Sequence, residues 1–132
     1  MLQQVLAGEM ETKSGYLENI NDISTGWKHS LALDKDGFVW SWGHDTGGIL
    51  GNGIDAENKS TPVRVLSGEQ SHTPHTYLKD IVDIAAGRSG IHSLAVSSDG
   101  YCWASGGWRQ QLVSYKGLGG YSRYKKLAGK IL

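Results

Sequence analysis

The chain has 132 residues, a length that suits one domain, and its 13 basic and 13 acidic residues balance. This balance gives no overall charge that would favour nucleic acid or a membrane surface as a partner. The single cysteine, Cys102, excludes an internal disulfide and a multi-cysteine zinc site. The 19 glycines, 5 tryptophans and 6 tyrosines favour β-structure with many tight turns.

The first predicted elements form a strand followed by a hairpin. Residues 18–25 predict a strand, and residues 29–33, "HSLAL", alternate with period two. The segment "DKDG" at 34–37 predicts a type I turn that places Gly37 in the left-handed region. Residues 38–42, "FVWSW", are aromatic and β-branched, so they predict the returning strand of the hairpin.

A loop and a further strand follow the hairpin. Residues 43–53 hold too many glycines for a helix or a central strand, which predicts a loop. Residues 60–66, "STPVRVL", predict a strand with Pro62 at its first position or on a sheet edge. No segment carries a convincing helical stripe of apolar residues. About four short antiparallel strands are therefore expected in this unit.

The same pattern then repeats. The stretch "HSLALDKDGFVWSWG" at 29–43 returns as "HSLAVSSDGYCWASG" at 92–106, and three further pairs recur in the same order upstream. The repeat is about sixty residues long, and units of four strands repeated along a chain predict the blades of a β-propeller. We assign structural roles to the residues that recur or bound these stretches: Gly26, His29, Asp36, Gly37, Trp40, Gly43, Gly87, His92, Asp99, Gly100, Trp103 and Gly106.

The repeat resembles that of the regulator of chromosome condensation family, including its bacterial tubulin-suppressor-like relatives. The resemblance rests on "ISTGWKHSLALDKDGFVWSWG", "GGILGNG" and "TPVRV" in the first unit, and on "IAAGRSGIHSLAVSSDGYCWASG" in the second. It implies an all-β fold, a seven-bladed β-propeller of antiparallel four-stranded blades. The chain is too short for that fold, because repeats need neighbours to bury their faces. We therefore expect an incomplete propeller.

Three segments are predicted: a first blade at 1–64, a second, incomplete blade at 65–106, and a degenerate basic tail at 107–132. The tail holds six Lys or Arg and no Asp or Glu, so we expect it to be poorly ordered or non-native, and a frameshift is one hypothesis for its origin. A basic arm at 109–130 that binds single-stranded nucleic acid is the less favoured alternative.

No signal peptide or transmembrane segment is predicted, the localisation stays open, and a longer parent protein could be exported.

The candidates for catalysis and ligand binding are weak. His29 and Ser30, like His92 and Ser93, are adjacent on a strand and point to opposite faces, so they are poorly placed to share a proton. The loop "GGILGNG" is not followed by the Lys-Ser/Thr of a phosphate loop. We therefore predict a protein that is not an enzyme and has no metal or cofactor.

The prediction for function is a non-catalytic repeat module that binds a protein, or the missing blades of a parent chain or of another copy. Propellers contact partners through loops, and exposed tryptophans such as Trp27 could mark a contact surface. The alternatives are a guanine-nucleotide exchange regulator by family resemblance, a remnant with no independent function, and a propeller hydrolase or lyase. The contact residues proposed in the variable loops are His44, Asp45, Asp55, Glu57, Asn58, His72 and His75.

Overall fold

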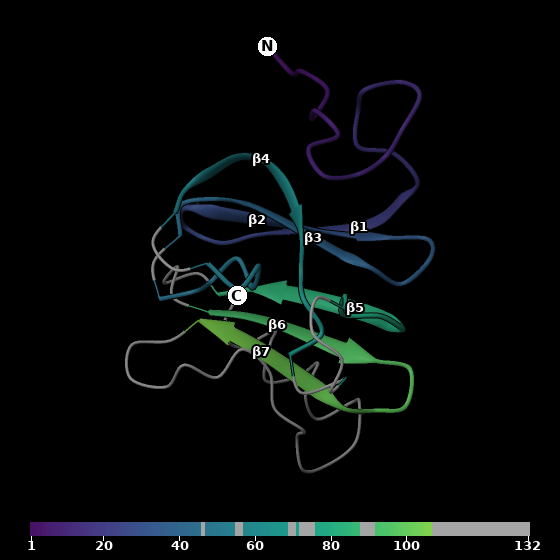
Figure 1. Ribbon diagram of the computed structural model, residues 1–132, viewed down its shortest axis with the longest axis vertical. Helices are drawn as coiled ribbons and strands as arrows, with labels where there is room; N and C mark the ends of the chain where they lie inside the picture. Colours follow the sequence, from purple (N-terminus) through teal and green to yellow (C-terminus); the bar gives the residue numbers. More distant parts are fainter. Residues whose placement is uncertain (46, 55–56, 69–70, 72–75, 88–91, 107–132) are drawn as a thin grey trace.

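The computed structural model describes residues 1–45, 47–54, 57–68, 71, 76–87 and 92–106. Within these residues the chain is all-β, and its strands form two antiparallel sheets (Figure 1). The predicted strands are confirmed at β1 (Ile20–Thr25), β2 (His29–Asp34), β3 (Val39–Gly43), β4 (Lys59–Arg64), β5 (Ile81–Ala86), β6 (His92–Ser97) and β7 (Cys102–Gly106).

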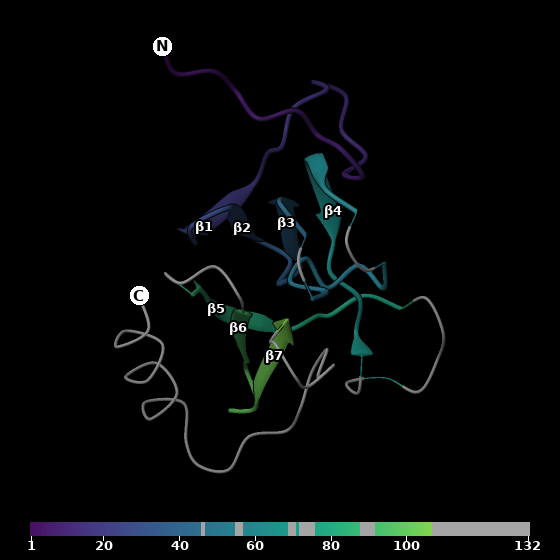
Figure 2. The same ribbon diagram turned by 90° about the vertical axis from the view of Figure 1, so that its left-hand side faces the viewer.

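Each sheet is a meander of sequential strands. The first sheet has the order β1-β2-β3-β4, and the second has the order β5-β6-β7. Pro62 lies in β4, an edge strand, where its missing N–H leaves no ladder hydrogen bond unmade. The two sheets lie face to face, with the N-terminal segment beyond the first sheet (Figures 1 and 2).

The hairpin turns have the predicted geometry in both sheets. Gly37 has a φ of 85° and Gly100 a φ of 88°, so both adopt the left-handed conformation that glycine allows without strain. The Gly37 N–H donates to the Asp34 carbonyl at 3.1 Å, and the Gly100 N–H donates to the Ser97 carbonyl at 2.9 Å. Each turn therefore brings two strands together through local sequence alone.

The main core lies between the two sheets. Leu31, Leu33 and Val39 of the first sheet pack against Ile84, Ala86, Ala95 and Trp103 of the second sheet. Val65 and Leu78, from the connection between the sheets, join the same cluster. A second, smaller core consists of Ile49, Leu50 and Val63, so the glycine-rich loop contributes buried side chains. Packing between the sheets, rather than within either one, holds this chain together.

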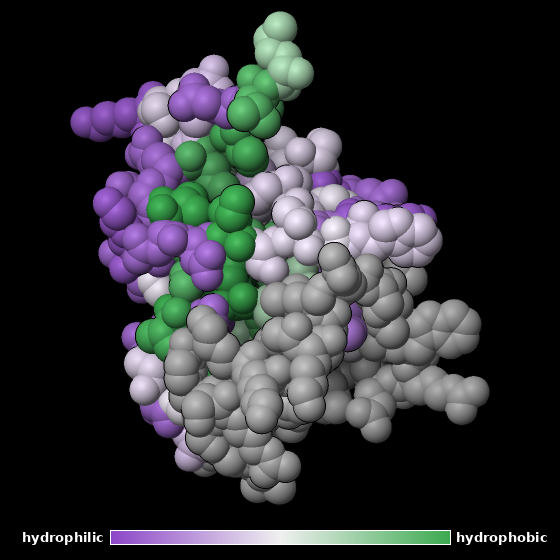
Figure 3. Space-filling view, turned by 180° about the vertical axis from the view of Figure 1, so that it is seen from behind, coloured by the Kyte–Doolittle hydropathy of each residue, from purple (hydrophilic) through white to green (hydrophobic). Residues whose placement is uncertain are grey.

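Ile84 and Ile23 occupy equivalent strand positions in the two sheets but differ in exposure. Ile84 lies opposite Ala95, faces the first sheet and is 6% exposed. Ile23 lies opposite Ala32 at the same place in the first sheet, yet it is 68% exposed. On the outer face of the first sheet Ile23 is therefore exposed, while Ala32 and Trp40 in the same row are 0% exposed. Figure 3 shows an apolar band on the side of the molecule that is hidden in Figure 1.

Within the part of the chain that the structure describes, there is no helix with the length and apolar character that a bilayer crossing requires.

Candidate protein-interaction surfaces

Two loops meet at one end of the first sheet and form what we call the loop surface: Trp27, Lys28, His44, Glu57 and Asn58. The His44 backbone N–H donates to the Lys28 carbonyl at 2.8 Å, which joins the loop after β1 to the loop after β3. Trp27 is 72% exposed, and the Lys28 ammonium lies 4.7 Å from the centroid of its ring, a cation–π contact. Tryptophan is enriched among the residues that dominate the binding energy of protein interfaces.

The predicted contact residues of the loop after β3 have two different environments. His44 Nδ1 lies 3.0 Å from Asn58 Oδ1, and Glu57 forms a 2.6 Å ion pair with Lys59; His44, Glu57 and Asn58 are exposed. Asp45, in contrast, is buried. Its Oδ1 accepts a hydrogen bond from the Leu50 backbone N–H, with 3.4 Å between nitrogen and oxygen. Asp45 thus shapes the loop, while the other three can contact a partner.

The remaining predicted contact residues, Asp55, His72 and His75, lie outside the described residues, as does the basic tail at 107–132 with its proposed nucleic-acid-binding stretch at 109–130. These assignments stay predictions.

A histidine and a serine from different sheets meet in the interior. His29 Nε2 lies 2.9 Å from Ser93 Oγ, and Ser93 Oγ lies 3.3 Å from the Ile49 carbonyl. The Ser93 hydroxyl donates to that carbonyl, which leaves its lone pairs free to accept from His29 Nε2–H. Ser105 donates to the same carbonyl at 3.0 Å. Because His29 and Ser93 are both buried, they lock the glycine-rich loop between the sheets and offer no nucleophile to a substrate.

Burial controls the charge of these histidines. Desolvation by burial and, to a smaller extent, the neighbouring His92 lower the pKa of His29 to about 4. Burial also lowers the pKa of His92. Among the described residues neither His29 Nδ1 nor His92 Nε2 has a hydrogen-bond partner. A proton placed on His29 Nδ1 would therefore be a buried donor without an acceptor, so the imidazole is neutral in the fold.

A glycine a few residues before each of these histidines, Gly26 before His29 and Gly87 before His92, leaves room for the imidazole ring. A Cβ on Gly87 would lie 2.7 Å from the His92 ring, and one on Gly26 would lie 2.5 Å from the ring of His29. These glycines recur in the repeat because a close approach of ring and backbone requires them. The contact supports the structural role that the repeat pattern predicts for both pairs.

The turn of the first sheet is organised by Asp34. Its carboxylate accepts hydrogen bonds from the backbone N–H groups of Asp36 and Phe38 at 2.9 and 3.0 Å, and from Trp40 Nε1 at 2.8 Å. The predicted turn residue Asp36 is exposed and contributes its N–H. Asp34 thus satisfies three donors, a role that the sequence pattern did not reveal.

The second sheet makes the corresponding contacts with different residues. Trp103 Nε1 donates to Ser97 Oγ at 3.0 Å, and Ser97 in turn donates to Asp99. A serine and an aspartate together therefore do what one aspartate does in the first sheet. The recurring element is an indole N–H bonded to the turn, which fixes the orientation of the tryptophan. Trp103 packs in the core between the sheets, whereas Trp40 lies on the outer face of the first sheet.

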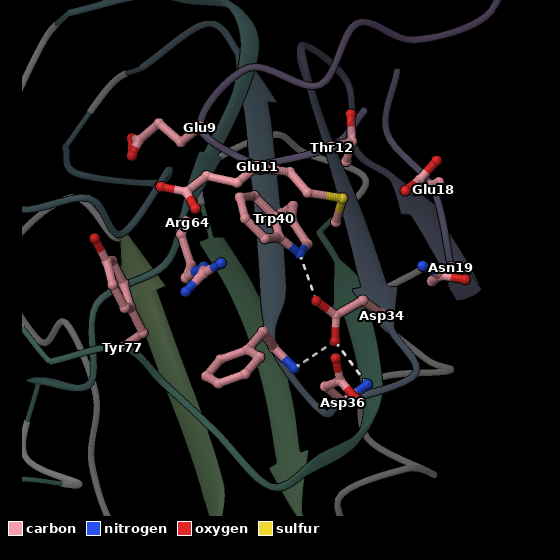
Figure 4. A pocket seen from close by; sticks show the side chains of 12 residues that line it. Glu9, Glu11, Thr12, Glu18, Asn19, Asp34, Asp36, Trp40, Arg64 and Tyr77 are labelled. Carbon is pink, nitrogen blue, oxygen red and sulfur yellow. Dashed lines mark hydrogen bonds between the residues drawn. The ribbon is translucent and has the colours of Figure 1, made fainter. Parts of the chain in front are cut away.

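A cavity of about 490 Å³ opens between the N-terminal segment and the outer face of the first sheet. In Figure 4, Arg64 lies among the aromatic side chains on its floor, with Glu9 and Glu11 above it. The Arg64 guanidinium lies 4.5 Å from the ring centroid of Trp40, 4.9 Å from that of Phe38 and 4.6 Å from that of Tyr77. The aromatic cage is thus filled by a cation of the chain itself.

Within the residues that the structure describes, no group of three or more His, Cys, Asp or Glu side chains is arranged to hold a metal ion.

The family follows from comparison of the sequence with family models. Two models described as the regulator of chromosome condensation (RCC1) repeat match this chain, one at residues 36–96 and the other at residues 20–49. Together they span residues 20–96, from the start of β1 into β6, and this range includes both repeated histidines, His29 and His92. The chain belongs to the RCC1 repeat family. Its two sheets are blades of the β-propeller that the repeat pattern predicts.

Curated relatives contain RCC1 repeats within much longer chains. Human HERC6, described as a probable E3 ubiquitin-protein ligase, is 37% identical over 101 residues, which cover 76% of this chain and 9% of that protein. RUG3, a mitochondrial RCC1 domain-containing protein of Arabidopsis thaliana, is 33% identical over 75% of this chain and 20% of its own length. The chain therefore spans a fifth or less of these relatives.

Solved structures agree on the fold. Human WBSCR16 matches with a TM-score of 0.58 and 24% identity, over 75% of this chain and 25% of that protein. Prp20p of Saccharomyces cerevisiae, studied for its binding to Gsp1p and histones, matches with a TM-score of 0.51 and 31% identity, over 68% of this chain and 19% of its own. The RCC1 repeats described here thus form only part of a propeller.

Proposed function

We propose that this chain is a non-catalytic RCC1 repeat module that binds a protein through the loop surface. Residues 1–64 and 65–106 act as its two blade units. The observation that carries the proposal is the 72% exposure of Trp27 at a point where two loops are tied together by a backbone hydrogen bond. Residues of this kind supply much of the binding energy in protein interfaces.

Two features support a binding role over catalysis. The buried His29 and Ser93 hold the blades together, so they are not available to a substrate. The relative Prp20p binds Gsp1p and histones, which makes these proteins the first partners to test. Gsp1p also addresses the alternative of an exchange regulator, because a nucleotide-release assay can be run on the same mixture.

The test measures binding of the full chain to purified Gsp1p and, separately, to purified histones. Trp27→Ala should weaken binding at least tenfold, about 1.4 kcal/mol. Tyr16→Ala is the matched control, because Tyr16 is also exposed but lies in the N-terminal segment; its affinity should stay within about twofold of the wild type.

The outcomes separate the proposal from its rivals. Equal affinities for wild type and Trp27→Ala would contradict the loop surface as the binding site. If neither protein binds, the remnant without independent function becomes the better interpretation. Turnover of a hydrolase or lyase substrate that His92→Ala abolishes would instead favour an enzyme.

A further inference from the structure

The second blade has one strand fewer than the first among the described residues. Its edge strand β7 hydrogen-bonds with β6, and its other side pairs with no described strand. In the first blade the same side of β3 pairs with β4, and the Val65 N–H continues that ladder by donating to the Val39 carbonyl at 2.9 Å. An unpaired edge of this kind is a template for another strand.

The N-terminal segment has the sequence of such a strand. Residues 1–8, "MLQQVLAG", align with residues 61–68, "TPVRVLSG", so Val5 and Leu6 correspond to Val65 and Leu66. The correspondence extends to structure, because Leu6 forms an isolated bridge with Tyr16 just as Leu66 does with Tyr77. Residues 1–5 therefore occupy the place, in the repeat, of the fourth strand of a blade.

Among the described residues, no strand of either sheet pairs with residues 1–5. Leu2 is 101% exposed and Val5 is 39% exposed, whereas Val65, the counterpart of Val5, is 7% exposed. The N-terminus lies beyond the first blade, at the end of the molecule farthest from β7, in both Figure 1 and Figure 2. Residues 1–5 and the edge of β7 that no described strand pairs with are thus too far apart to meet within one molecule.

We propose that residues 1–5 of a second copy of this chain add to β7 as the fourth strand of its blade. The pairing of β3 with β4 supplies the register. Gln4 of the second copy would lie opposite Trp103, as Arg64 lies opposite Trp40. The N–H of Val5 would donate to the Cys102 carbonyl, as that of Val65 donates to Val39.

The same arrangement covers Ile23, which is exposed on the outer face of the first blade. The N-terminal segment is attached to that blade, because the Glu9 N–H donates to the Pro62 carbonyl of β4 at 2.9 Å. A copy that donates its strand therefore brings its own Ile23 toward the neighbouring copy's second blade. Ile23 would then be buried as Ile84 is buried between the blades of one chain. Continuity with the interface inside the chain supports a second copy as the occupant.

The assembly that results is head-to-tail. The described residues of each copy contribute eight strands, seven in its own sheets and one donated, which is enough for two blades. Because propellers close with about four to eight blades, a closed ring would hold about two to four copies.

The first test is the mass of the full chain by light scattering after size exclusion. We expect about two to four times the protomer mass of 14.3 kDa. Gln3→Pro should reduce the mass to that of the protomer. Gln3 lies two residues from Val5, so the backbone N–H groups of both residues point to the same side of the strand and would donate to β7. Proline at position 3 has no N–H and would remove one of these hydrogen bonds.

Leu2→Pro is the matched control. Leu2 corresponds to Pro62, which β4 already contains, so this variant should assemble like the wild type. Both changes lie in an exposed segment, so the circular dichroism of each protomer should match that of the wild type. In addition, an excess of the free peptide of residues 1–8 should lower the mass of the wild-type assembly.

A wild-type chain that runs as a protomer would overturn the proposal. So would a Gln3→Pro variant that keeps the wild-type mass, because assembly would then not need the donated strand. A mass that falls for Gln3→Pro and for the added peptide, but not for Leu2→Pro, supports it. These measurements are independent of the loop surface, so failure of one proposal leaves the other intact.

Discussion

Acid should destabilise this protein through His29. In the folded chain burial lowers the pKa of His29 from 6.5 to about 4, while the unfolded chain keeps the ordinary value. As the pH falls below 6.5 the unfolded state therefore binds a proton that the folded state does not, and stability decreases until about pH 4. At about 1.4 kcal/mol per pH unit, the loss from this group is about 2 kcal/mol by pH 5 and about 3 kcal/mol by pH 4.

Urea unfolding followed by tryptophan fluorescence at a series of pH values measures this loss. His29→Gln is the control, because glutamine carries a donor for Ser93 but does not titrate. The wild type should lose stability between pH 6.5 and pH 5, a range in which ordinary carboxylates remain mostly ionised, and the variant should lose about 2 kcal/mol less. The lowered pKa of His92 acts in the same direction in both proteins. Parallel curves for wild type and variant would refute the assignment of the effect to His29.

Three further substitutions test the packing. Trp40→Phe removes an indole N–H that donates to a buried carboxylate at 2.8 Å, and unfolding in urea should show a loss of about 1–3 kcal/mol. Gly43→Ala should lower the melting temperature more than Gly15→Ala: both glycines have positive φ, but only at Gly43 would a Cβ overlap a backbone oxygen, whereas nothing lies near Gly15. Ile84→Ala should cost about 2–5 kcal/mol in urea unfolding, and Ile23→Ala should cost under about 1 kcal/mol in a protomer; equal losses would contradict the difference in burial.

The elements that the sequence predicted correctly are those whose signals are local. The alternation in "HSLAL" and the Asp-Gly turn at Gly37 act within a few residues, and the corresponding strands and turns are present. The edge position of Pro62 also follows from a local property, the missing N–H. The repeat extended these predictions to the second blade, since the same local rules apply there.

The contacts that the sequence did not reveal depend on how the blades stack. Strand geometry correctly excluded a pair between His29 and the adjacent Ser30, but it could not indicate that His29 meets Ser93 of the next blade. The glycine-rich loop was predicted, yet the burial of Ile49 inside it depends on the position of the second blade. Asp34 was similarly missed, because its three donors converge only once the hairpin has folded.

Comparison of the two blades separates what a repeat encodes from what its neighbours supply. Ile23 and Ile84 have the same side chain at the same strand position, but their exposure differs. The first blade covers Ile84, whereas no described blade covers Ile23. Burying a side chain of this size is worth about 1.5–3 kcal/mol. A protomer forgoes that stabilisation at Ile23, and it also leaves Val5 partly exposed. The repeat thus encodes a surface whose stability depends on a partner blade, so association and folding of this chain should be thermodynamically linked.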